Sequence, residues 1–297
     1  MLRQITILGT GLIGGSLALA AKREGIRVIG SDRPSILDEA KRRGVIDTAV
    51  ADPVAASKGS DVVVLAMPVG AILELMEKLA PALSPGTLLT DVGSTKSAIV
   101  ARAYELFGDA AASRFLPGHP MAGKEHSGVE NADADLFRDA VWLVTPLEVQ
   151  TLDFGRAGDY TAFLAKIGAR VIAMDAERHD RVCAWVSHLP QMLSTALAGT
   201  LLDEFTASGP EGATLDDVHA VGGRALREMT RIASSPYSMW RDIALTNSEN
   251  IADALLALEQ RLAHLRENLR SPELRREFEQ GNRFHDEKPQ ARNQKQK

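Results

Sequence analysis

The chain has 297 residues, of which 45% are hydrophobic and 25% are charged, and its formal net charge at pH 7 is −5. This size allows one large core or two ordinary ones, and we expect two domains. The acidic balance argues against a general nucleic-acid or anionic-membrane surface, because such surfaces need clustered Lys and Arg, so an anionic substrate has to be bound by a local cationic pocket.

The first predicted elements are a strand and a helix joined by a glycine-rich turn. An apolar run over residues 4–8 opens directly into a G-x-G-x-x-G pattern, and a helical pattern follows. In this pattern the glycines allow a sharp turn, close approach of backbone N–H groups to a pyrophosphate, and tight helix packing. A tight turn without a ligand is the alternative. The predicted cofactor-binding residues are Gly9, Thr10, Gly11, Leu12, Ile13 and Gly14.

A second predicted strand, over residues 27–30, is followed by Asp32 and Arg33. A carboxylate at this point accepts hydrogen bonds from a free ribose hydroxyl and repels a 2′-phosphate, which favours NAD over NADP. Arg33 could instead stack on adenine or hold a 2′-phosphate. Asp32 could also serve only as the cap of the next helix.

Further strands are predicted over residues 62–66, 87–91, 114–116, 141–145 and 170–173. Their alternation with helical patterns predicts an α/β fold over residues 1–173, a Rossmann-like, doubly wound, mostly parallel sheet with helices on both faces. From residue 174 to 281 the strand signal disappears, which predicts an all-α second domain. Its helices are expected over residues 177–202, 218–233, 238–246 and 249–269, with a loop at 208–212.

The last of these helices carries apolar residues alternately three and four positions apart. This spacing is that of a heptad seam, and Thr246 with Glu249 is a candidate capping box at its start. A seam of this kind packs inside its own domain or against a second copy, and we expect a homodimer through this domain. The seam consists of Ile251, Leu255, Leu258, Leu262, Leu265 and Leu269.

The polar residues 282–297, which follow this domain, are expected to be a disordered tail.

Ligands of an open parallel sheet bind beyond the carboxyl ends of its strands, where the unusual residues of this chain gather. Met67 and Pro68 follow one predicted strand, Ser94 follows the next, and His119 follows the strand at 114–116. These segments are expected at the same edge as the glycine-rich turn. Met67, Pro68 and Ser94 are therefore expected beside the cofactor.

His119 is the candidate general base. Pro120 favours an extended backbone before it and the flanking glycines allow close approach, so we expect the imidazole in a rigid loop near the nicotinamide. Its unperturbed pKa of about 6.5 suits proton abstraction from an alcohol at neutral pH. An ordinary polar loop residue is the alternative. Ser94 could bond to His119 or to a substrate hydroxyl, or cap a helix starting at Thr95.

Two other histidines, His179 and His188, lie two and a half helical turns apart and are expected to face opposite sides. His188 precedes Leu189-Pro190 at a point that could face the cleft. His179 is expected to be structural or solvent-facing, and Cys183 to be a buried small hydrophobe. No metal-ligand cluster is predicted.

Several segments make the chain similar to the prephenate and arogenate (cyclohexadienyl) dehydrogenase family of tyrosine biosynthesis. The glycine-rich turn is common to many dehydrogenases, but the histidine-proline segment followed by two late segments in this order is more specific. The resemblance covers nearly the whole chain. The segments lie at residues 9–16, 91–96, 118–123, 187–190, 230–233 and 239–242, with Glu125 and Gly128 between them.

The resemblance implies NAD-dependent oxidation of a cyclohexadienyl carbinol with loss of the ring carboxylate, giving 4-hydroxyphenylpyruvate from prephenate or tyrosine from arogenate. It implies that His119 is the base bound to the hydroxyl, that Ser94 supports it, and that Arg231 holds a substrate carboxylate as a bidentate clamp. Lys124 adds a charge beside the pocket, and the further pocket residues are His188 and Glu125.

Two other functions stay open. A β-hydroxy-acid dehydrogenase that uses NAD or NADP would share the first domain, but its catalytic lysine normally lies on a helix early in the second, where this chain has His179 and His188. A silent NAD-binding regulator would not need both His119 and Arg231.

The sequence also bears on location. The early first strand leaves no room for a signal peptide, and no apolar run approaches 18 residues. The single cysteine excludes internal disulfides. We therefore expect a cytoplasmic protein.

Overall fold

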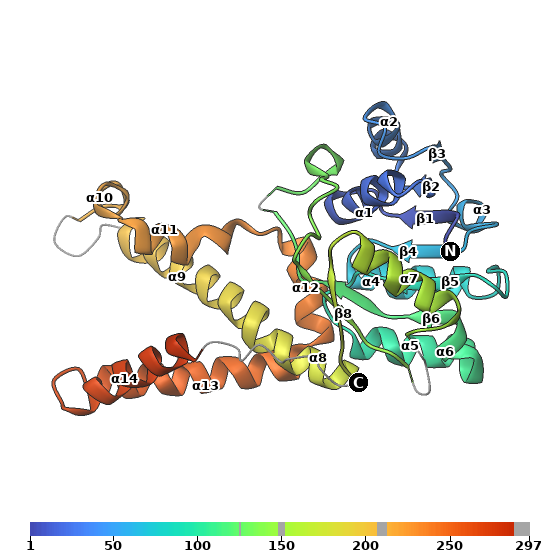
Figure 1. The fold of residues 1–297 in the computed structure, drawn as a ribbon. Helices are drawn as coiled ribbons and strands as arrows, with labels where there is room; N and C mark the ends of the chain where they lie inside the picture. The colour runs from blue at the N-terminus through green and yellow to red at the C-terminus, as the bar shows by residue number, and fades with distance from the viewer. Residues whose placement is uncertain (125, 148–151, 207–212, 288–297) are drawn as a thin grey trace.

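A computed structural model describes residues 1–124, 126–147, 152–206 and 213–287. An α/β domain comes first, and a helical domain extends from it as two diverging arms (Figure 1). The α/β domain contains β1 (Gln4–Leu8), α1 (Leu12–Arg23), β2 (Arg27–Ser31), α2 (Pro34–Arg42), β3 (Thr48–Ala49), α3 (Pro53–Ser57), β4 (Val62–Leu65), α4 (Val69–Leu79), β5 (Leu88–Asp91), α5 (Ser97–Phe107), η1 (Gly108–Ala110), α6 (Ala111–Arg114), β6 (Phe115–Leu116), β7 (Gly118–Pro120), η2 (Val129–Asn131), β8 (Val141–Val144), α7 (Gly155–Lys166) and β9 (Arg170–Ala173).

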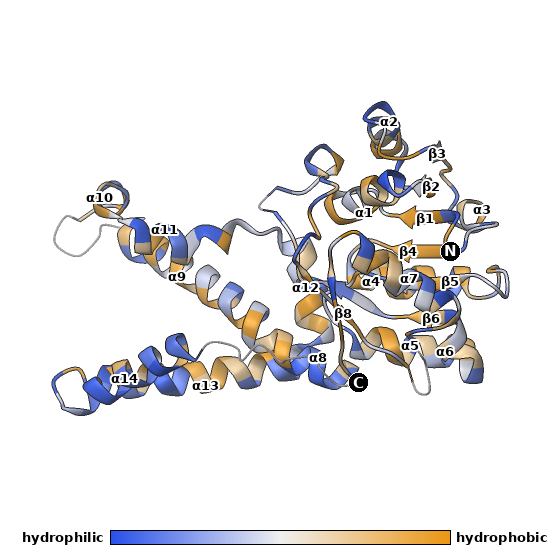
Figure 2. Ribbon diagram, viewed as in Figure 1, coloured by the Kyte–Doolittle hydropathy of each residue, from blue (hydrophilic) through white to orange (hydrophobic). Residues whose placement is uncertain are grey.

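The main sheet is parallel throughout, with the strand order β3-β2-β1-β4-β5-β6. Chain order reverses between β1 and β4, which is the switch point where ligands of such sheets bind. Every residue of β4 and β5 is buried, as parallel strands covered on both faces require. The hydrophobic residues gather in these strands and the helices beside them (Figure 2). The predicted Rossmann-like fold is confirmed.

A second, smaller sheet has the order β7-β8-β9, with β7 antiparallel to β8 and β8 parallel to β9. The sequence pattern assigned the last two of these strands to the same sheet as the others. It also placed His119 in a loop, which is wrong, because His119 lies on β7 opposite Leu143. Strands of two or three residues, such as β7 and β3, are too short to show an alternating pattern.

The helical domain contains α8 (Ala176–Cys183), a π-helical turn η3 (Ala184–His188), α9 (Leu189–Thr206), α10 (Leu215–Val221), α11 (Arg224–Thr230), η5 (Arg231–Ser234), α12 (Tyr237–Thr246), α13 (Ser248–Glu267) and α14 (Glu273–Asp286). The predicted helix over 218–233 is broken at Gly222 and Gly223. The predicted disorder is wrong for residues 282–286, which continue α14, whereas residues 288–297 and the predicted loop at 208–212 lie outside the described residues. Within the described chain, no helix is long and apolar enough to cross a membrane.

The predicted heptad seam lies on α13, and most of it is not covered by its own domain. Ile251 is buried, but Leu262 is 51% exposed and Leu269, beyond the helix end, is 63% exposed. The predicted capping box is wrong. Thr246 belongs to α12 and its hydroxyl donates to Asp242 O, while α13 begins at Ser248 without a side-chain cap.

Candidate active site

The glycine-rich turn has the shape that a dinucleotide requires. Gly9 has φ +95°, and a Cβ there would lie 2.2 Å from Ala66 O; a Cβ on Gly14 would lie 1.9 Å from Gly9 O. Gly11 is the N-cap of α1 and has no side chain to satisfy the first N–H groups of the helix. A Cβ on Gly11 would meet nothing within 4 Å, so the helix N-terminus, with Leu12 and Ile13 in its first turn, faces open space that suits a pyrophosphate.

Asp32 is held against this turn rather than against the next helix. Its Oδ2 accepts from Thr10 N at 2.7 Å, and its Oδ1 accepts from Arg33 N at 2.7 Å. The N-cap position of α2 is occupied by Arg33, which is exposed, so Asp32 does not cap α2. A half-buried carboxylate beside the turn therefore remains a candidate for the ribose.

Met67 and Pro68 lie at the end of β4, next to the turn of β1. Met67 is half-buried and packs against one of the two hydrophobic clusters of the sheet, and Pro68 is the exposed N-cap residue of α4. Their predicted contact with the cofactor stays a prediction.

A buried ion pair fixes the loop after β5. Lys96 Nζ contacts the carboxylate of Asp91, and both side chains are fully buried. Asp91 also accepts from Gly93 N at 2.7 Å and from Gly118 N at 3.2 Å, which ties β7 to the end of β5. Burial lowers the pKa of Lys96, and the neighbouring Asp91 carboxylate opposes that shift.

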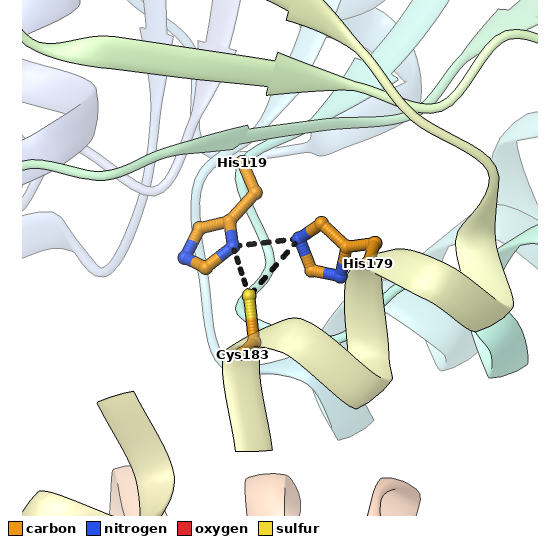
Figure 3. Close-up of side chains that lie close together, drawn as sticks. All are labelled: His119, His179 and Cys183. Atoms are coloured by element: carbon orange, nitrogen blue, oxygen red, sulfur yellow. Dashed lines mark hydrogen bonds between the residues drawn. The ribbon is translucent and has the colours of Figure 1, made fainter. Parts of the chain in front are cut away.

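Three side chains form a hydrogen-bonded row that ends at His119. The Nδ1 of His119 lies 2.9 Å from His179 Nε2, and His179 Nδ1 lies 2.8 Å from Asp180 Oδ1 (Figure 3 draws the two histidines). A carboxylate can only accept, so His179 Nδ1 carries a hydrogen and its Nε2 accepts from His119 Nδ1–H. His119 Nε2 then keeps a lone pair, and the ring presents it away from His179.

The surroundings of His119 keep this base neutral. The residue is 8% exposed, and burial is the main reason that the pKa of His119 lies well below its ordinary value of 6.5. Positive charge on His179, Lys96 or His188 would oppose its protonation further. Burial alone would raise the pKa of Asp180, but hydrogen bonds from His179, Ser97 and the Lys96 backbone hold it below its usual value.

Asp180 also joins the two domains. Its oxygens accept from Lys96 N at 2.7 Å and from Ser97 N at 2.8 Å, so a residue of α8 caps α5. Asp242 of α12 does the same for α4, because its Oδ2 accepts from Gly70 N at 2.9 Å. Carboxylates at helix N-termini are favoured by the helix dipole.

The prediction that Ser94 caps a helix starting at Thr95 is wrong, because α5 starts two residues later and its cap comes from the other domain. Thr95 instead pairs its hydroxyl with that of Thr246 at 2.7 Å. Ser94 is half-buried and makes no side-chain hydrogen bond within the described part of the chain, so its hydroxyl is available to a ligand.

His188 is a buried donor with a defined tautomer. Asn247 Nδ2 lies 3.2 Å from His188 Nδ1 and also donates to Asp180 O at 2.9 Å. An amide N–H donates, so His188 Nδ1 accepts and Nε2 carries the hydrogen. Burial lowers the pKa of His188 to about 4. Among the described residues His188 Nε2 has no partner, and the ring stands edge-on to Trp240 at 5.8 Å.

The remaining predicted substrate residues lie around this centre or outside the description. Arg231 is exposed on η5, and the neighbouring Ile232 O accepts from Gln191 Nε2 at 2.9 Å, which holds the η5 turn against the first turn of α9. Lys124 is exposed and its Nζ lies 3.0 Å from the Asp133 carboxylate. Glu125 lies outside the described residues.

The sequence pattern missed His179, Asp180 and the role of Cys183. His179 is fully buried, so the expectation of a solvent-facing side chain is wrong, while Cys183 is buried as expected. A signal was present, because His179 and Cys183 are four residues apart and thus share one helix face. Their sulfur and Nε2 atoms lie 3.6 Å apart.

Two family models match the chain, and together they cover most of it. The nucleotide-binding domain of prephenate dehydrogenase matches residues 17–173, and its dimerization domain matches residues 175–280. The chain belongs to the prephenate dehydrogenase family. This agrees with the resemblance that the sequence motifs indicated.

Individual members of the family are similar over most of this chain. A prephenate dehydrogenase from Lactococcus lactis is 38% identical over 84% of this chain, and the match spans 66% of that relative's own length. The structure of a prephenate dehydrogenase from A. aeolicus, in complex with hydroxyphenyl propionate and NAD+, has a TM-score of 0.82 at 31% identity and covers 97% of this chain and 96% of its own. The structure of a Synechocystis arogenate dehydrogenase has a TM-score of 0.77 at 30% identity, and the match covers 95% of this chain and 99% of that one.

Proposed function

We propose that this chain catalyses the NAD-dependent oxidative decarboxylation of prephenate to 4-hydroxyphenylpyruvate, of arogenate to tyrosine, or of both. The observation that carries the proposal is the row His119–His179–Asp180, which presents an unprotonated His119 Nε2 near the carboxyl edge of the main sheet. The A. aeolicus neighbour, which binds NAD+ and a hydroxyphenyl acid, supports it.

The residues of the first domain fit a nicotinamide dinucleotide. Gly11 leaves room at the N-terminus of α1 for the pyrophosphate, and Gly9 and Gly14 allow the close packing that shapes this turn. Asp32 is placed to accept from a ribose hydroxyl. A bound NAD⁺ supplies the acceptor for a hydride that leaves the carbinol carbon of the substrate. Arg33 is exposed beside Asp32, so the preference for NAD over NADP rests on Asp32.

In the proposed reaction His119 moves one proton out and back. Its Nε2 takes the hydroxyl proton as the hydride departs, and His119 becomes an imidazolium. The proton stays on His119, and none is relayed through His179 to Asp180. The ring carboxylate then leaves as CO₂, and its electron pair makes the ring aromatic with a phenolate oxygen. That oxygen takes the proton back from His119, so the reaction needs no other acid.

Three side chains are proposed to hold the substrate. Arg231 binds a carboxylate, because a fixed guanidinium offers two parallel donors to it. The contact of Ile232 with Gln191, one turn beyond His188, supports a place for Arg231 beside the same centre. His188 Nε2–H donates to a second polar group of the substrate, and Ser94 hydrogen-bonds the reacting hydroxyl.

We also propose that the chain acts as a homodimer through its helical domain. The match to a dimerization domain supports this, and so do the exposed apolar side chains along the two arms. α9 is apolar on most of its circumference, yet few of its residues are buried by the chain itself, and such a helix normally lies inside a larger core. These exposed side chains include Leu202, Leu255, Leu256, Leu262 and Phe278.

The test is the formation of NADH, followed by absorbance, with prephenate, arogenate and a β-hydroxy acid offered separately. NADH formation with prephenate or arogenate, and release of CO₂ in equal amount, is the expected result. Turnover of the β-hydroxy acid alone would replace the proposal with the hydroxy-acid alternative. Binding of NAD⁺ by calorimetry without turnover of any of the three would point to a silent regulator.

A further inference from the structure

A cluster of metal-binding side chains lies on the inner side of His119, opposite to its proposed catalytic nitrogen. His119 Nδ1, His179 Nε2 and Cys183 Sγ all lie within 4.8 Å of one another. The three atoms point to a common centre between β7 and α8 (Figure 3). The hydrogen-bonded row explains the two histidines, but the proposed reaction has no use for the thiol.

We propose that these three atoms form an inhibitory site for a soft divalent ion such as Zn²⁺. Two imidazole nitrogens and a thiolate are ligands that zinc and cobalt prefer, whereas magnesium and calcium prefer oxygen. Water would complete a tetrahedron. The inhibitory effect rests on the proposed role of His119 as a base, but binding of the ion does not.

The distances suit such a site. With zinc bonds of ordinary length, a tetrahedron places two nitrogens ~3.4 Å apart and a nitrogen ~3.6 Å from the sulfur. The sulfur lies 3.6 Å from His179 Nε2 and 3.9 Å from His119 Nδ1, already near these values. The two nitrogens are 2.9 Å apart and have to separate by roughly half an ångström, as the ion replaces the hydrogen between them.

The charges around the cluster also suit a cation. Asp180 accepts from His179 Nδ1 at 2.8 Å, which leaves Nε2 as the free ligand atom. A carboxylate behind a metal-bound histidine is the usual second partner of zinc sites, where it fixes the tautomer and strengthens the ligand. The ammonium of Lys96, which lies close enough to lower the pKa of His119, is paired with the Asp91 carboxylate. His188 is uncharged at neutral pH because burial lowers its pKa to about 4.

Binding would silence the base by moving one hydrogen. The ion takes the lone pair of His119 Nδ1, so the hydrogen of the neutral imidazole moves to Nε2. The thiol of Cys183 loses its proton to solvent as it becomes a ligand. His119 Nε2 then carries a hydrogen and has no lone pair for the substrate hydroxyl, so turnover stops while the cofactor site is unchanged.

Metal binding is tested first without any substrate, on the full chain freed of metal with a chelator. Addition of Co²⁺ is expected to give thiolate-to-cobalt charge-transfer absorption and tetrahedral visible bands that saturate at one ion per chain. Cys183→Ala should remove the charge-transfer band and weaken cobalt binding about tenfold or more, since even the loss of a second-shell partner costs about that much. His219→Ala, which removes an exposed histidine on α10, is the matched control.

A thermal melt and one further variant guard against misfolding. Thermal melting of Cys183→Ala should stay close to wild type, and His179→Gln should lose cobalt binding as well. A folded wild type without charge-transfer absorption, or a visible spectrum that is the same in Cys183→Ala, would overturn the site.

Inhibition is tested with buffered Zn²⁺ in the NADH assay. Wild type and His219→Ala should lose turnover and regain it with EDTA, whereas Cys183→Ala should need about tenfold more Zn²⁺ or higher. Equal inhibition of all three proteins would overturn the inhibitory role. If no substrate gives NADH, the proposed function fails, and the cobalt titration still decides whether the ion binds.

Discussion

The two domains of this chain differ in where their hydrophobic side chains are buried. In the α/β domain the central strands of the main sheet are covered on both faces, and two clusters fill the space between sheet and helices. In the described part of the helical domain, the buried cluster is small and consists of Ala184, Ile243 and Ile251, with Met192 and Trp240 beside it. Among the described residues, the first domain thus buries most of its large hydrophobic side chains within one copy, whereas the second leaves many of them exposed.

This difference teaches how the site is divided. The proposed base lies on β7, in the α/β domain, whereas the residues that orient it and two of the three proposed to bind substrate come from the helical domain. The predictions below separate these contributions.

The largest effect is expected from charges on the α13 seam. Leu258→Glu with Leu262→Glu should halve the mass measured by light scattering, because two carboxylates cannot be desolvated in an apolar interface. Helical circular dichroism of the second domain should fall while NAD⁺ still binds. Gln260→Glu, an exposed position on the same helix, is the control. If the wild type is already monomeric at micromolar concentration, the proposed homodimer is wrong.

His119→Asn tests the residue that the α/β domain is proposed to contribute to the chemistry. It should lower kcat about 10²-fold or more with little change in KM, because a general base contributes about that much. The mass and melting temperature should stay as in wild type. In the wild type, kcat should be level through neutral pH and fall only in acid well below pH 6.5, because burial depresses the pKa of His119 and the base is lost only when it protonates. An Asn variant with unchanged kcat would contradict the assignment.

Arg231→Ala tests what the helical domain adds to binding. Loss of one charge-assisted contact costs roughly 1.5 to 3 kcal/mol, so KM for the cyclohexadienyl substrate should rise about ten- to over a hundredfold. NAD⁺ affinity should change little, and Arg231→Lys should recover only part of the loss. If KM stays within about twofold of wild type, Lys124 is the next cation to test.

Asp180→Asn tests the contact between the domains. An amide can donate to His179 Nδ1, so this nitrogen no longer has to carry the hydrogen and the tautomer of His119 is no longer fixed. We therefore expect kcat to fall roughly 10- to 100-fold. The melting temperature should drop as well, because the cap of α5 is weakened. Asp242→Asn weakens the cap of α4 without touching the histidines, so it should lower the melting temperature but leave kcat nearly unchanged.

The smallest effect is expected from Asp32→Ser. The ratio of kcat/KM for NAD⁺ and NADP⁺ should narrow, since the repulsion of a 2′-phosphate is removed and Arg33 remains. Substrate KM and the mass should not change. A wild type that prefers NADP⁺ would contradict the role given to Asp32.

The sequence was a good guide wherever a local pattern decides the structure. Local sequence patterns, which involve only nearby residues, decide the first turn with its glycines, the buried parallel strands and the long helices. The sequence predicts these elements to within a few residues. The failure at β7 has a long-range cause. β7 is held by Asp91 through Gly118 N, a contact across 27 positions that no local pattern contains.

The candidate site was predictable only in part for the same reason. His119 stands out by its glycine and proline neighbours, but its partner His179 is 60 positions away, and the cap of α5 comes from Asp180, 83 positions from Ser97. The role of Arg231 came from the family resemblance, since an exposed arginine on a helix has no distinguishing local signal. The exposure of the α13 seam needed the three-dimensional arrangement of the arms.

The double use of Asp180 limits how such enzymes can be recombined. One carboxylate both holds the domains together and sets which nitrogen of His119 is basic. Consider a chimera that joins this α/β domain to the helical domain of a relative. Both domains should fold, but His119 would carry its hydrogen on the required nitrogen only if the chimera keeps the His179–Asp180 pair together with β7. The two domains therefore form one unit in the proposed catalysis, even though each has its own buried cluster.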